Sequence, residues 1–303
     1  MKRISIGSWA YTIGPYADDP VDWNTVCDRL QELGFDGVEL GGFPPHPNPD
    51  DVAPDQRAAI RAGVEDRGMG FSGLAANLWS QNLANTDDNA AYLAEFQKNC
   101  VFANDLGING VRVDTVQPPT LLATEEHATV MKRITGAFTV AKRIAKDHGV
   151  YLTWEFEPGF VLNKPSDILN VLDAVDDPNF GVMYDTSHGH MVSVVGARHH
   201  GEPETLEGGQ VELLRKLSGR INHIHLIDSD NSCHKDEAGE DETSMHLPFG
   251  EGVVDFDPIL AELAKVDTGH DWWTIDLCFW PDAWDATAKC KAFMDQVNQR
   301  YFA

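Results

Sequence analysis

The chain has 303 residues, of which 42% are hydrophobic and 23% are charged, a composition typical of a globular protein with a large buried core. Its formal net charge of −25 at pH 7 would repel nucleic acid phosphates and an anionic membrane surface, so we expect neither as a partner. The five cysteines are widely spaced without a CxxC pair, and no apolar run reaches the roughly 18 residues of a membrane span, so we expect a cytoplasmic protein.

Short apolar runs typical of β-strands recur along the whole chain. They lie at residues 4–11, 35–40, 70–75, 110–114, 150–157, 180–185, 221–228 and 272–279. Segments with helical periodicity separate most of them, and several end at a glycine. These segments include 21–34, 90–107, 127–149 and 166–175. The alternation, with no long linker, predicts one α/β domain over residues 1–303, a single (β/α)8 TIM barrel.

One long stretch after the seventh predicted strand breaks this alternation. It runs from Ser229 to Gly252 and is rich in Asp, Glu, His and Gly. A loop of this length in a compact domain is typically functional, such as a lid over a site. A disordered acidic insertion is the alternative.

Three of the predicted strands carry a metal-binding side chain at or near the downstream end. The run LTWEFEP contains Glu155, FGVMYDTSH contains Asp185, and INHIHLID contains His225. The carboxyl ends of barrel strands meet at one face, so these side chains are expected to converge. Buried carboxylates need a compensating cation, and few Lys or Arg residues lie near these ends. The pattern therefore predicts one divalent ion, which could be Mn, Mg, Co or Zn.

Each ligand also has a structural interpretation. Glu155 could cap a helix or pair with Arg112, and Asp185 could be an ordinary turn residue before Thr-Ser. His225 alternates with His223, so one of the two could simply fill the barrel lumen. A metal site is favoured because three separate strand ends would otherwise carry ligand-type residues by coincidence.

Further polar and aromatic residues at the predicted strand ends and in the long loop are candidates for binding a substrate. His188 follows Asp185 by one helical turn and could bind a substrate oxygen or act as an acid. Indole rings near strand ends could stack on a sugar ring, as at Trp79 and Trp280. The full set of substrate-binding candidates is Trp9, Glu39, Asn77, Arg112, Glu157, His188 and His246.

Four segments resemble the sugar-phosphate isomerase/epimerase family of xylose-isomerase-like TIM barrels, and the resemblance extends over nearly the whole chain. The segments are GVYLTWEFEPGFVLNKPSD, DPNFGVMYDTSHGHM, INHIHLID and HLPFGEGVVDFDPILAEL. The resemblance implies Glu155, Asp185 and His225 as metal ligands. The family usually supplies a fourth ligand, a Glu, from the eighth strand, and here WWTIDLCFW offers Asp276, which is one methylene shorter.

The resemblance implies a metal-dependent enzyme, with manganese among the candidate metals, that acts on a small sugar or polyol. Glu155 and Asp276 would exchange protons beside a carbonyl through an enediolate, giving isomerisation or epimerisation. The alternative on the same site is a lyase, either inosose-dehydratase-like or keto-glycoside-cleaving. A non-catalytic sugar-binding barrel is a further alternative, and phosphodiester hydrolysis as in endonuclease IV relatives is opposed by the charge. A homo-oligomer is compatible with the sequence.

Overall fold

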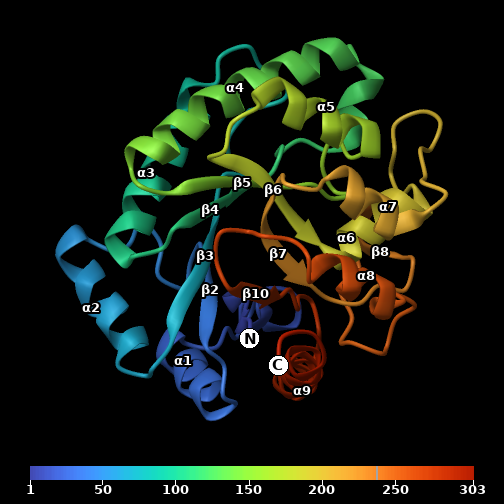
Figure 1. Ribbon diagram of the computed structural model, residues 1–303. Helices are drawn as coiled ribbons and strands as arrows, with labels where there is room; N and C mark the ends of the chain where they lie inside the picture. The colour runs from blue at the N-terminus through green and yellow to red at the C-terminus, as the bar shows by residue number, and fades with distance from the viewer. Residues whose placement is uncertain (237) are drawn as a thin grey trace.

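A computed structural model describes residues 1–236 and 238–303, and parallel strands form a barrel at its centre (Figure 1). The barrel strands are β1 (Arg3–Ile6), β2 (Gly37–Gly42), β3 (Gly70–Ala76), β4 (Gly110–Val113), β5 (Tyr151–Glu155), β6 (Phe180–Asp185), β7 (Ile221–Leu226) and β10 (Trp272–Ile275). Their order in the sheet is β1-β10-β7-β6-β5-β4-β3-β2, and a parallel bridge between Gly7 and Glu39 joins the two edge strands. The expected single (β/α)8 barrel is confirmed.

Helices surround the barrel, as Figure 1 shows. They are α1 (Trp23–Glu32), α2 (Pro54–Glu65), α3 (Ala90–Leu106), α4 (His127–Asp147), α5 (Pro165–Val175), α6 (Thr186–His190), α7 (Gly209–Lys216), α8 (Phe256–Leu263) and α9 (Ala283–Tyr301). Short 3-10 helices form η1 (Ser8–Tyr11), η2 (Gly14–Tyr16) and η3 (Pro119–Ala123), and a π-helical turn forms η4 (Met191–Val195). Local sequence sets several boundaries: Asp22 caps α1, and Gly107 ends α3 at φ 73°.

Residue alternation along the strands separates an apolar outer layer from a polar lumen. Val38 and Leu40 of β2 are fully buried on the outer, helix-covered face, whereas Glu39 between them faces inward. In the lumen Thr274 donates a hydrogen bond to Glu39 Oε2 over 2.9 Å, and Ser5 lies 2.8 Å from Thr274. The lumen of this barrel is therefore built around a buried carboxylate.

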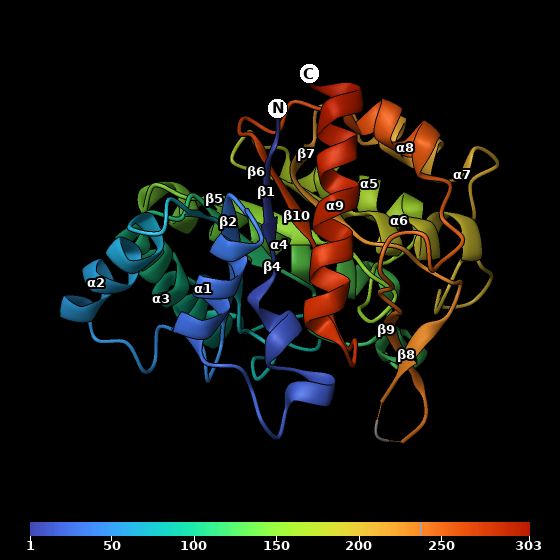
Figure 2. The same ribbon diagram turned by 90° about the horizontal axis from the view of Figure 1, so that it is seen from below.

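The long stretch after β7 contains its own small sheet. Strand β8 (Cys233–Lys235) pairs antiparallel with β9 (Asp241–Ser244), and Figure 2 shows this hairpin at the end of the molecule opposite to both chain termini. Asp228 holds the base of the stretch, because its carboxylate accepts hydrogen bonds of 2.8–3.1 Å from the backbone N–H groups of Ser229, Gly250, Gly252 and Val254. A Cβ at Gly252 would lie 2.3 Å from Asp228 Oδ1, so only glycine fits there. We call residues 229–252 the insertion.

Several predicted strands are shorter in the structure than in the sequence pattern. The first ends at Ile6, because the chain turns into η1 directly after Gly7. The fifth, seventh and eighth barrel strands also end two to four residues early, at Glu155, Leu226 and Ile275. Their last predicted residues therefore lie in loops above the barrel.

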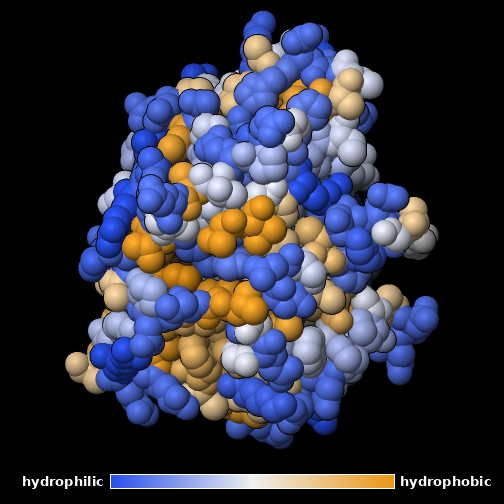
Figure 3. Space-filling model, turned by 90° about the vertical axis from the view of Figure 1, so that its right-hand side faces the viewer, coloured by the Kyte–Doolittle hydropathy of each residue, from blue (hydrophilic) through white to orange (hydrophobic). Residues whose placement is uncertain are grey.

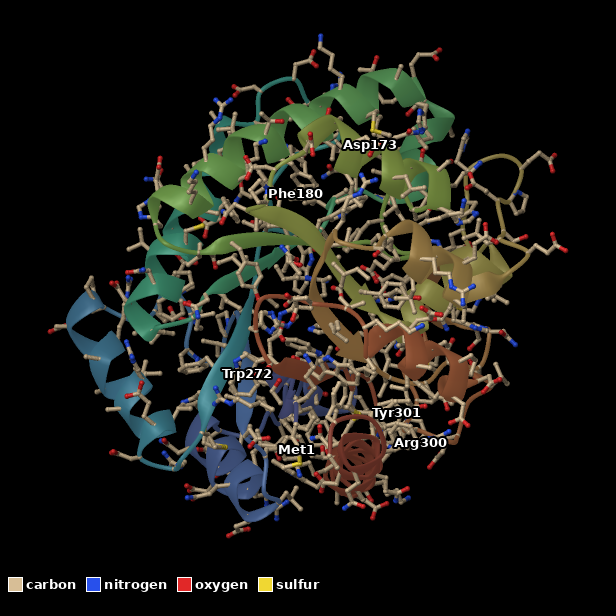
Figure 4. All side chains as sticks on the ribbon, in the orientation of Figure 1. Met1, Asp173, Phe180, Trp272, Arg300 and Tyr301 are labelled. Atoms are coloured by element: carbon tan, nitrogen blue, oxygen red, sulfur yellow. The ribbon has the colours of Figure 1, made fainter. Side chains whose placement is uncertain are left out.

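The outer surface is mainly hydrophilic, with apolar patches in the middle of the face that Figure 3 shows. Trp272 at the start of β10, labelled in Figure 4, marks the amino-terminal end of the barrel, and the Arg3 guanidinium lies 3.8 Å from the centre of its ring. Within residues 1–236 and 238–303, none of the helices combines the length and apolar character needed to cross a bilayer.

Candidate functional site

The four residues expected to bind metal come from four consecutive strands of the barrel sheet. Glu155 ends β5, Asp185 ends β6, His225 lies one residue before the end of β7, and Asp276 directly follows β10. All four are at least nine-tenths buried. One Asp185 oxygen also caps α6, since it accepts a 2.8 Å hydrogen bond from the His188 N–H.

Three of these side chains converge on one point. His225 Nδ1 lies 3.3 Å from Glu155 Oε1 and 3.4 Å from Asp276 Oδ2. The other oxygen of each carboxylate is already engaged: Arg112 Nε donates to Glu155 Oε2 over 2.6 Å, and Trp9 Nε1 donates to Asp276 Oδ1 over 2.7 Å. Each carboxylate thus directs one oxygen toward the imidazole nitrogen.

Four buried donor atoms of this region have no hydrogen-bond partner among the described residues. Glu155 Oε1 and His225 Nδ1 belong to this cluster, whereas Asp185 Oδ2 and His246 Nε2 belong to residues that form a second cluster with His188; we call the four atoms the open donor set. Buried polar atoms are normally paired, and such oxygen and imidazole donors are those that divalent Mn, Co and Zn accept. The residues present therefore fit the metal centre expected from the sequence.

The electrostatics of the site favour a positive charge at the same point. Burial opposes ionisation of Glu155, but the Arg112 guanidinium and the imidazole of His225 outweigh it and hold its pKa well below the usual range. Burial raises the pKa of Asp185 to about 7. Burial also opposes protonation of His225, yet Glu39 and the facing carboxylates hold its pKa well above the usual value.

Glu39 lies beneath this cluster and does not line the cavity above it. Its two oxygens pair with His223 Nε2 at 2.8 Å and with His225 Nε2 at 3.1 Å. Because β2 continues to Gly42, Glu39 lies in mid-strand rather than at the strand end. Its contacts hold the His225 ring so that Nδ1 faces the carboxylates, which is the usual outer-shell role of a carboxylate next to a ligating histidine.

The hydrogen bonds continue from Glu39 toward the amino-terminal end of the barrel. His223 Nδ1 lies 3.1 Å from the Tyr151 hydroxyl, which lies 3.0 Å from His270 Nε2. His270 Nδ1 accepts a 3.1 Å hydrogen bond from the Trp272 N–H. We call Glu39, His223, Tyr151 and His270 the lumen chain; none of them has an unpaired side-chain polar atom within the described part of the protein.

The insertion contributes four consecutive residues to the site. Thr243 donates a short hydrogen bond to Glu157. Ser244 Oγ lies 2.8 Å from His188 Nδ1, and the Met245 carbonyl accepts from Ser187 over 3.1 Å. His246 Nδ1 lies 2.8 Å from the Asp276 carbonyl oxygen. The insertion is thus part of the wall of the site.

Two connected cavities lie above the candidate ligands. The inner one has a volume of about 140 Å³ and the outer one about 1030 Å³. The predicted site residues that line the inner cavity are Trp9, Arg112, Glu155, Glu157, His188, His225, His246 and Asp276. Both cavities share Ile13, Trp79, Glu157, Thr243 and Phe279, so one opens into the other.

The Glu157 carboxyl group and the His188 imidazole, which both line the inner cavity, have shifted pKa values. Burial, reinforced by the neighbouring Glu155 carboxylate, raises the pKa of Glu157 to about 8. Burial and the neighbouring His246 lower the pKa of His188 to about 3. His188 Nε2 lies 3.5 Å from Glu157 Oε2, so the two groups face each other across the cavity wall.

The sequence pattern missed part of the cavity wall and included residues outside it. Asn77 is half-buried directly after β3, and neither it nor Trp280 is among the described residues that line these cavities. Cys278, Phe279 and Thr243 line the inner cavity and were not predicted. Cys278 shares the alternation of Asp276, so strand periodicity could have identified it; nothing in the sequence pattern points to Thr243.

Comparisons with known proteins agree with this architecture. Residues 27–292 match the family model described as xylose isomerase-like TIM barrel. An inosose dehydratase from Geobacillus kaustophilus is 27% identical over 291 residues, which cover 90% of this chain and 86% of that protein.

Among solved structures, an IOLI protein with a bound zinc atom superposes with a TM-score of 0.73 at 17% identity over 100% of both chains. A D-tagatose 3-epimerase-like protein superposes with a TM-score of 0.70 at 18% identity over 99% of both chains. The family match extends over most of the chain, and the relatives are named as enzymes. The chain belongs to the xylose isomerase-like TIM barrel family.

Proposed function

We propose that this protein is a divalent-metal-dependent isomerase or epimerase that acts on a sugar, keto-sugar or cyclic polyol. The observation that carries the proposal is the open donor set, which lies beside a cavity of about 140 Å³ at the carboxyl-terminal end of the barrel. The ligands would be Glu155, Asp185, His225 and Asp276. Names of related proteins, such as D-psicose 3-epimerase and inosose dehydratase, support a small polyhydroxylated substrate.

When bound, a divalent cation would polarise the substrate carbonyl and stabilise the enediolate that forms when the neighbouring carbon loses its proton. Glu155 and Asp276 would carry that proton, since each directs one carboxylate oxygen to the same point beside His225 Nδ1. Arg112 would keep Glu155 oriented through its hydrogen bond to the other oxygen. The Trp9 indole would do the same for Asp276.

Substrate hydroxyl groups would be held by the polar wall of the inner cavity. Glu157 and His188 face each other there at 3.5 Å, and both are more than nine-tenths buried. Thr243 and Ser244 of the insertion form hydrogen bonds with these two side chains. This arrangement supports a site that excludes bulk water while the proton is moved.

Elimination of water or of a glycosidic leaving group is a second candidate, because the Asp276 side chain is short. Both proposed bases are held through one carboxylate oxygen, Glu155 by Arg112 and Asp276 by Trp9, but Asp276 has one methylene fewer than Glu155 with which to reach the second face of a substrate. A site in which only one base reaches the substrate favours removal of a β-substituent over return of the proton. The names of the curated relatives support the same reading.

Product analysis separates the two reactions. The protein, supplied in turn with Mn²⁺, Co²⁺, Mg²⁺ and Zn²⁺, would be incubated in D₂O with ketohexoses, 3-keto-glycosides and inosose, and products followed by NMR. Epimerisation gives a stereoisomer with deuterium at the exchanged carbon, whereas elimination gives an unsaturated or dehydrated product. Absence of bound metal and of any activity gain on adding these ions would contradict both and favour a non-catalytic sugar-binding barrel.

The residue at position 276 tests the balance between the two. Asp276→Glu restores the longer side chain that the family usually carries at this position. We expect a rise in the ratio of epimerised to eliminated product, because the carboxylate then extends farther toward the substrate while Trp9 can still bind it. An unchanged ratio would show that the side-chain length does not direct the reaction. A cytoplasmic location and the oligomeric state stay predictions from the sequence.

A further inference from the structure

His246 stands out because it belongs to the open donor set but comes from the insertion rather than from a barrel strand. Its side chain is 3% exposed, and its Nε2 has no hydrogen-bond partner among the described residues. Donor atoms of His246 lie within 4.8 Å of those of Asp185 and His188 in one cluster, and of Asp276 and Cys278 in another. The residue therefore links the Asp185 side of the site to the Asp276 side.

The hydrogen bonds of His246 fix which nitrogen is available. Its Nδ1 lies 2.8 Å from the backbone carbonyl oxygen of Asp276, 3.0 Å from Cys278 Sγ and 3.5 Å from Asp276 Oδ2, and a carbonyl oxygen can only accept. Nδ1 must therefore carry the proton, which leaves a lone pair on Nε2 in the neutral ring. A ring that donates Nδ1–H to a carbonyl and has a free Nε2 has the usual arrangement of a metal-ligating histidine.

The short side chain at position 276 makes a further nitrogen donor useful. Asp276 Oδ1 is bound by Trp9, and Asp276 Oδ2 lies 3.4 Å from His225 Nδ1. We propose that His246 Nε2 binds the same divalent ion as an additional ligand and compensates for the shortened carboxylate. This inference rests on the proposed metal centre and adds a ligand supplied by the insertion.

A second imidazole changes the metal preference of the site. Two imidazole donors beside carboxylates favour borderline ions such as Zn²⁺ and Co²⁺ over Mg²⁺, which prefers oxygen ligands. The insertion would then contribute to metal selection as well as to the cavity wall. Its backbone hydrogen bonds around Asp228 hold the segment that carries His246.

The test is metal binding by the full-length protein, independent of activity. Metal-free protein would be titrated with Zn²⁺, Co²⁺ and Mg²⁺ by calorimetry, and the visible absorption of the Co²⁺ form recorded. In His246→Asn, the Asn amide N–H can still donate to the Asp276 carbonyl, but the side chain has no atom at the position of Nε2 that could bind the metal. We expect at least about a tenfold loss of Zn²⁺ and Co²⁺ affinity, since losing only an outer-shell partner costs about 10- to 100-fold, and a changed Co²⁺ spectrum.

Two further variants separate ligation from folding of the insertion. His246→Gln places an amide near the position of Nε2 and should recover part of the affinity. His190→Asn is the matched control, because His190 Nε2 also binds the insertion, at Asn231 Oδ1 over 2.6 Å, but lies outside the open donor set. Its metal affinity and Co²⁺ spectrum should equal those of the wild type.

The outcomes are distinct. Wild-type affinity and an unchanged Co²⁺ spectrum in His246→Asn would overturn the role of His246 and leave the proposed metal centre intact. Failure of the wild-type protein to bind any of the three ions or Mn²⁺ would overturn both. A selective loss in His246→Asn with none in His190→Asn supports the additional ligand.

Discussion

The two ends of the barrel interior use the same residue types but satisfy them in opposite ways. At the amino-terminal end, the lumen chain pairs its carboxylate, imidazole and hydroxyl groups with one another. At the carboxyl-terminal end, the open donor set has no partners among the residues that the structure describes. A fully paired network stabilises the fold and orients its side chains, whereas unpaired buried donor atoms are available to bind a ligand. Glu39 connects the two, because it binds a histidine of each.

The cluster of Glu39, His223 and His225 is a less favourable place for a metal than the open donor set, although its donors also lie within 4.8 Å of one another. Both Glu39 oxygens are engaged in hydrogen bonds at 2.8 and 3.1 Å to imidazole nitrogens. A metal there would have to displace a proton from each pair. At the carboxyl-terminal end His225 Nδ1 has only longer ion-pair contacts with Glu155 and Asp276, at 3.3 and 3.4 Å, and the open donor set makes no hydrogen bond among the described residues.

The largest effect is expected from Glu155→Gln at the open end. The change preserves size but removes a metal-binding charge and the proposed base, so activity should fall at least about 100-fold and bound metal should be lost. Metal content per chain and kcat/KM provide the measurement. Asp167→Asn is the control, because Asp167 is a buried carboxylate paired with His127 at 2.7 Å outside the barrel. Full activity in Glu155→Gln would remove the site as described.

Glu39→Gln should produce the next largest effect, because it breaks the connection between the two ends. The oxygen of the Gln amide can accept a hydrogen bond from only one of the two histidines, His223 or His225. The amide NH₂ group then faces the N–H of the other imidazole, and two donors cannot form a hydrogen bond. We expect a 10- to 100-fold loss of metal affinity through misorientation of His225, and a loss of about 3 kcal/mol in the unfolding free energy of the metal-free protein. Calorimetric titration and denaturant unfolding measure the two effects. Unchanged metal affinity would mean that Glu39 does not orient His225.

Tyr151→Phe should affect only the closed end. It removes the hydroxyl between His223 and His270, so the unfolding free energy should fall by about 1–2 kcal/mol. Metal affinity should stay close to that of the wild type, because Glu39 and His225 keep their hydrogen bond. A clear loss of metal affinity would show that the two ends are coupled more tightly than the comparison implies.

An effect that appears only on acidification is expected from His270 at the closed end. Burial and the neighbouring His223 lower the pKa of His270 to about 4, while the unfolded chain should titrate near 6.5. The folded state then binds fewer protons than the unfolded state, so stability should fall as pH decreases from about 6.5 to about 4. Denaturant unfolding of metal-free protein across this range measures the slope. His270→Gln should show a shallower slope, and an equal slope would contradict the assignment.

Strand periodicity predicts the open end better than the closed end. Glu155, Asp185 and His225 lie within three residues of the ends of the predicted strands and at or next to the ends of the real strands, and parallel strands of a barrel end at a common face. Glu39 is the next-to-last residue of the predicted second strand, 35–40, but the real strand continues through Gly41 and Gly42. The Glu39 side chain therefore lies deeper in the barrel lumen than a residue at the strand end. Two consecutive glycines are not typical of a β-strand, so the sequence pattern does not predict this extension.

The contribution of the insertion could not be derived from the pattern. His246 is predicted as a site residue, but its contact with the Asp276 carbonyl depends on the path of the whole segment 229–252. That path is set by long-range hydrogen bonds, such as those from Thr243 to Glu157 and from Arg198 Nη1 to the Glu242 carbonyl. Local sequence does not encode such partners.

The carboxylate of Asp228 changes the entropy of closing the insertion. It ties residue 229 to residues 250, 252 and 254, and Asp228 and Leu247 also exchange both backbone hydrogen bonds. With the ends of the insertion already joined, the free energy of closing it rises by only about 0.6 kcal/mol for each doubling of its length. The hairpin can therefore gain or lose residues at small thermodynamic expense, and the barrel offers a place where new recognition elements can be grafted over an unchanged reaction centre.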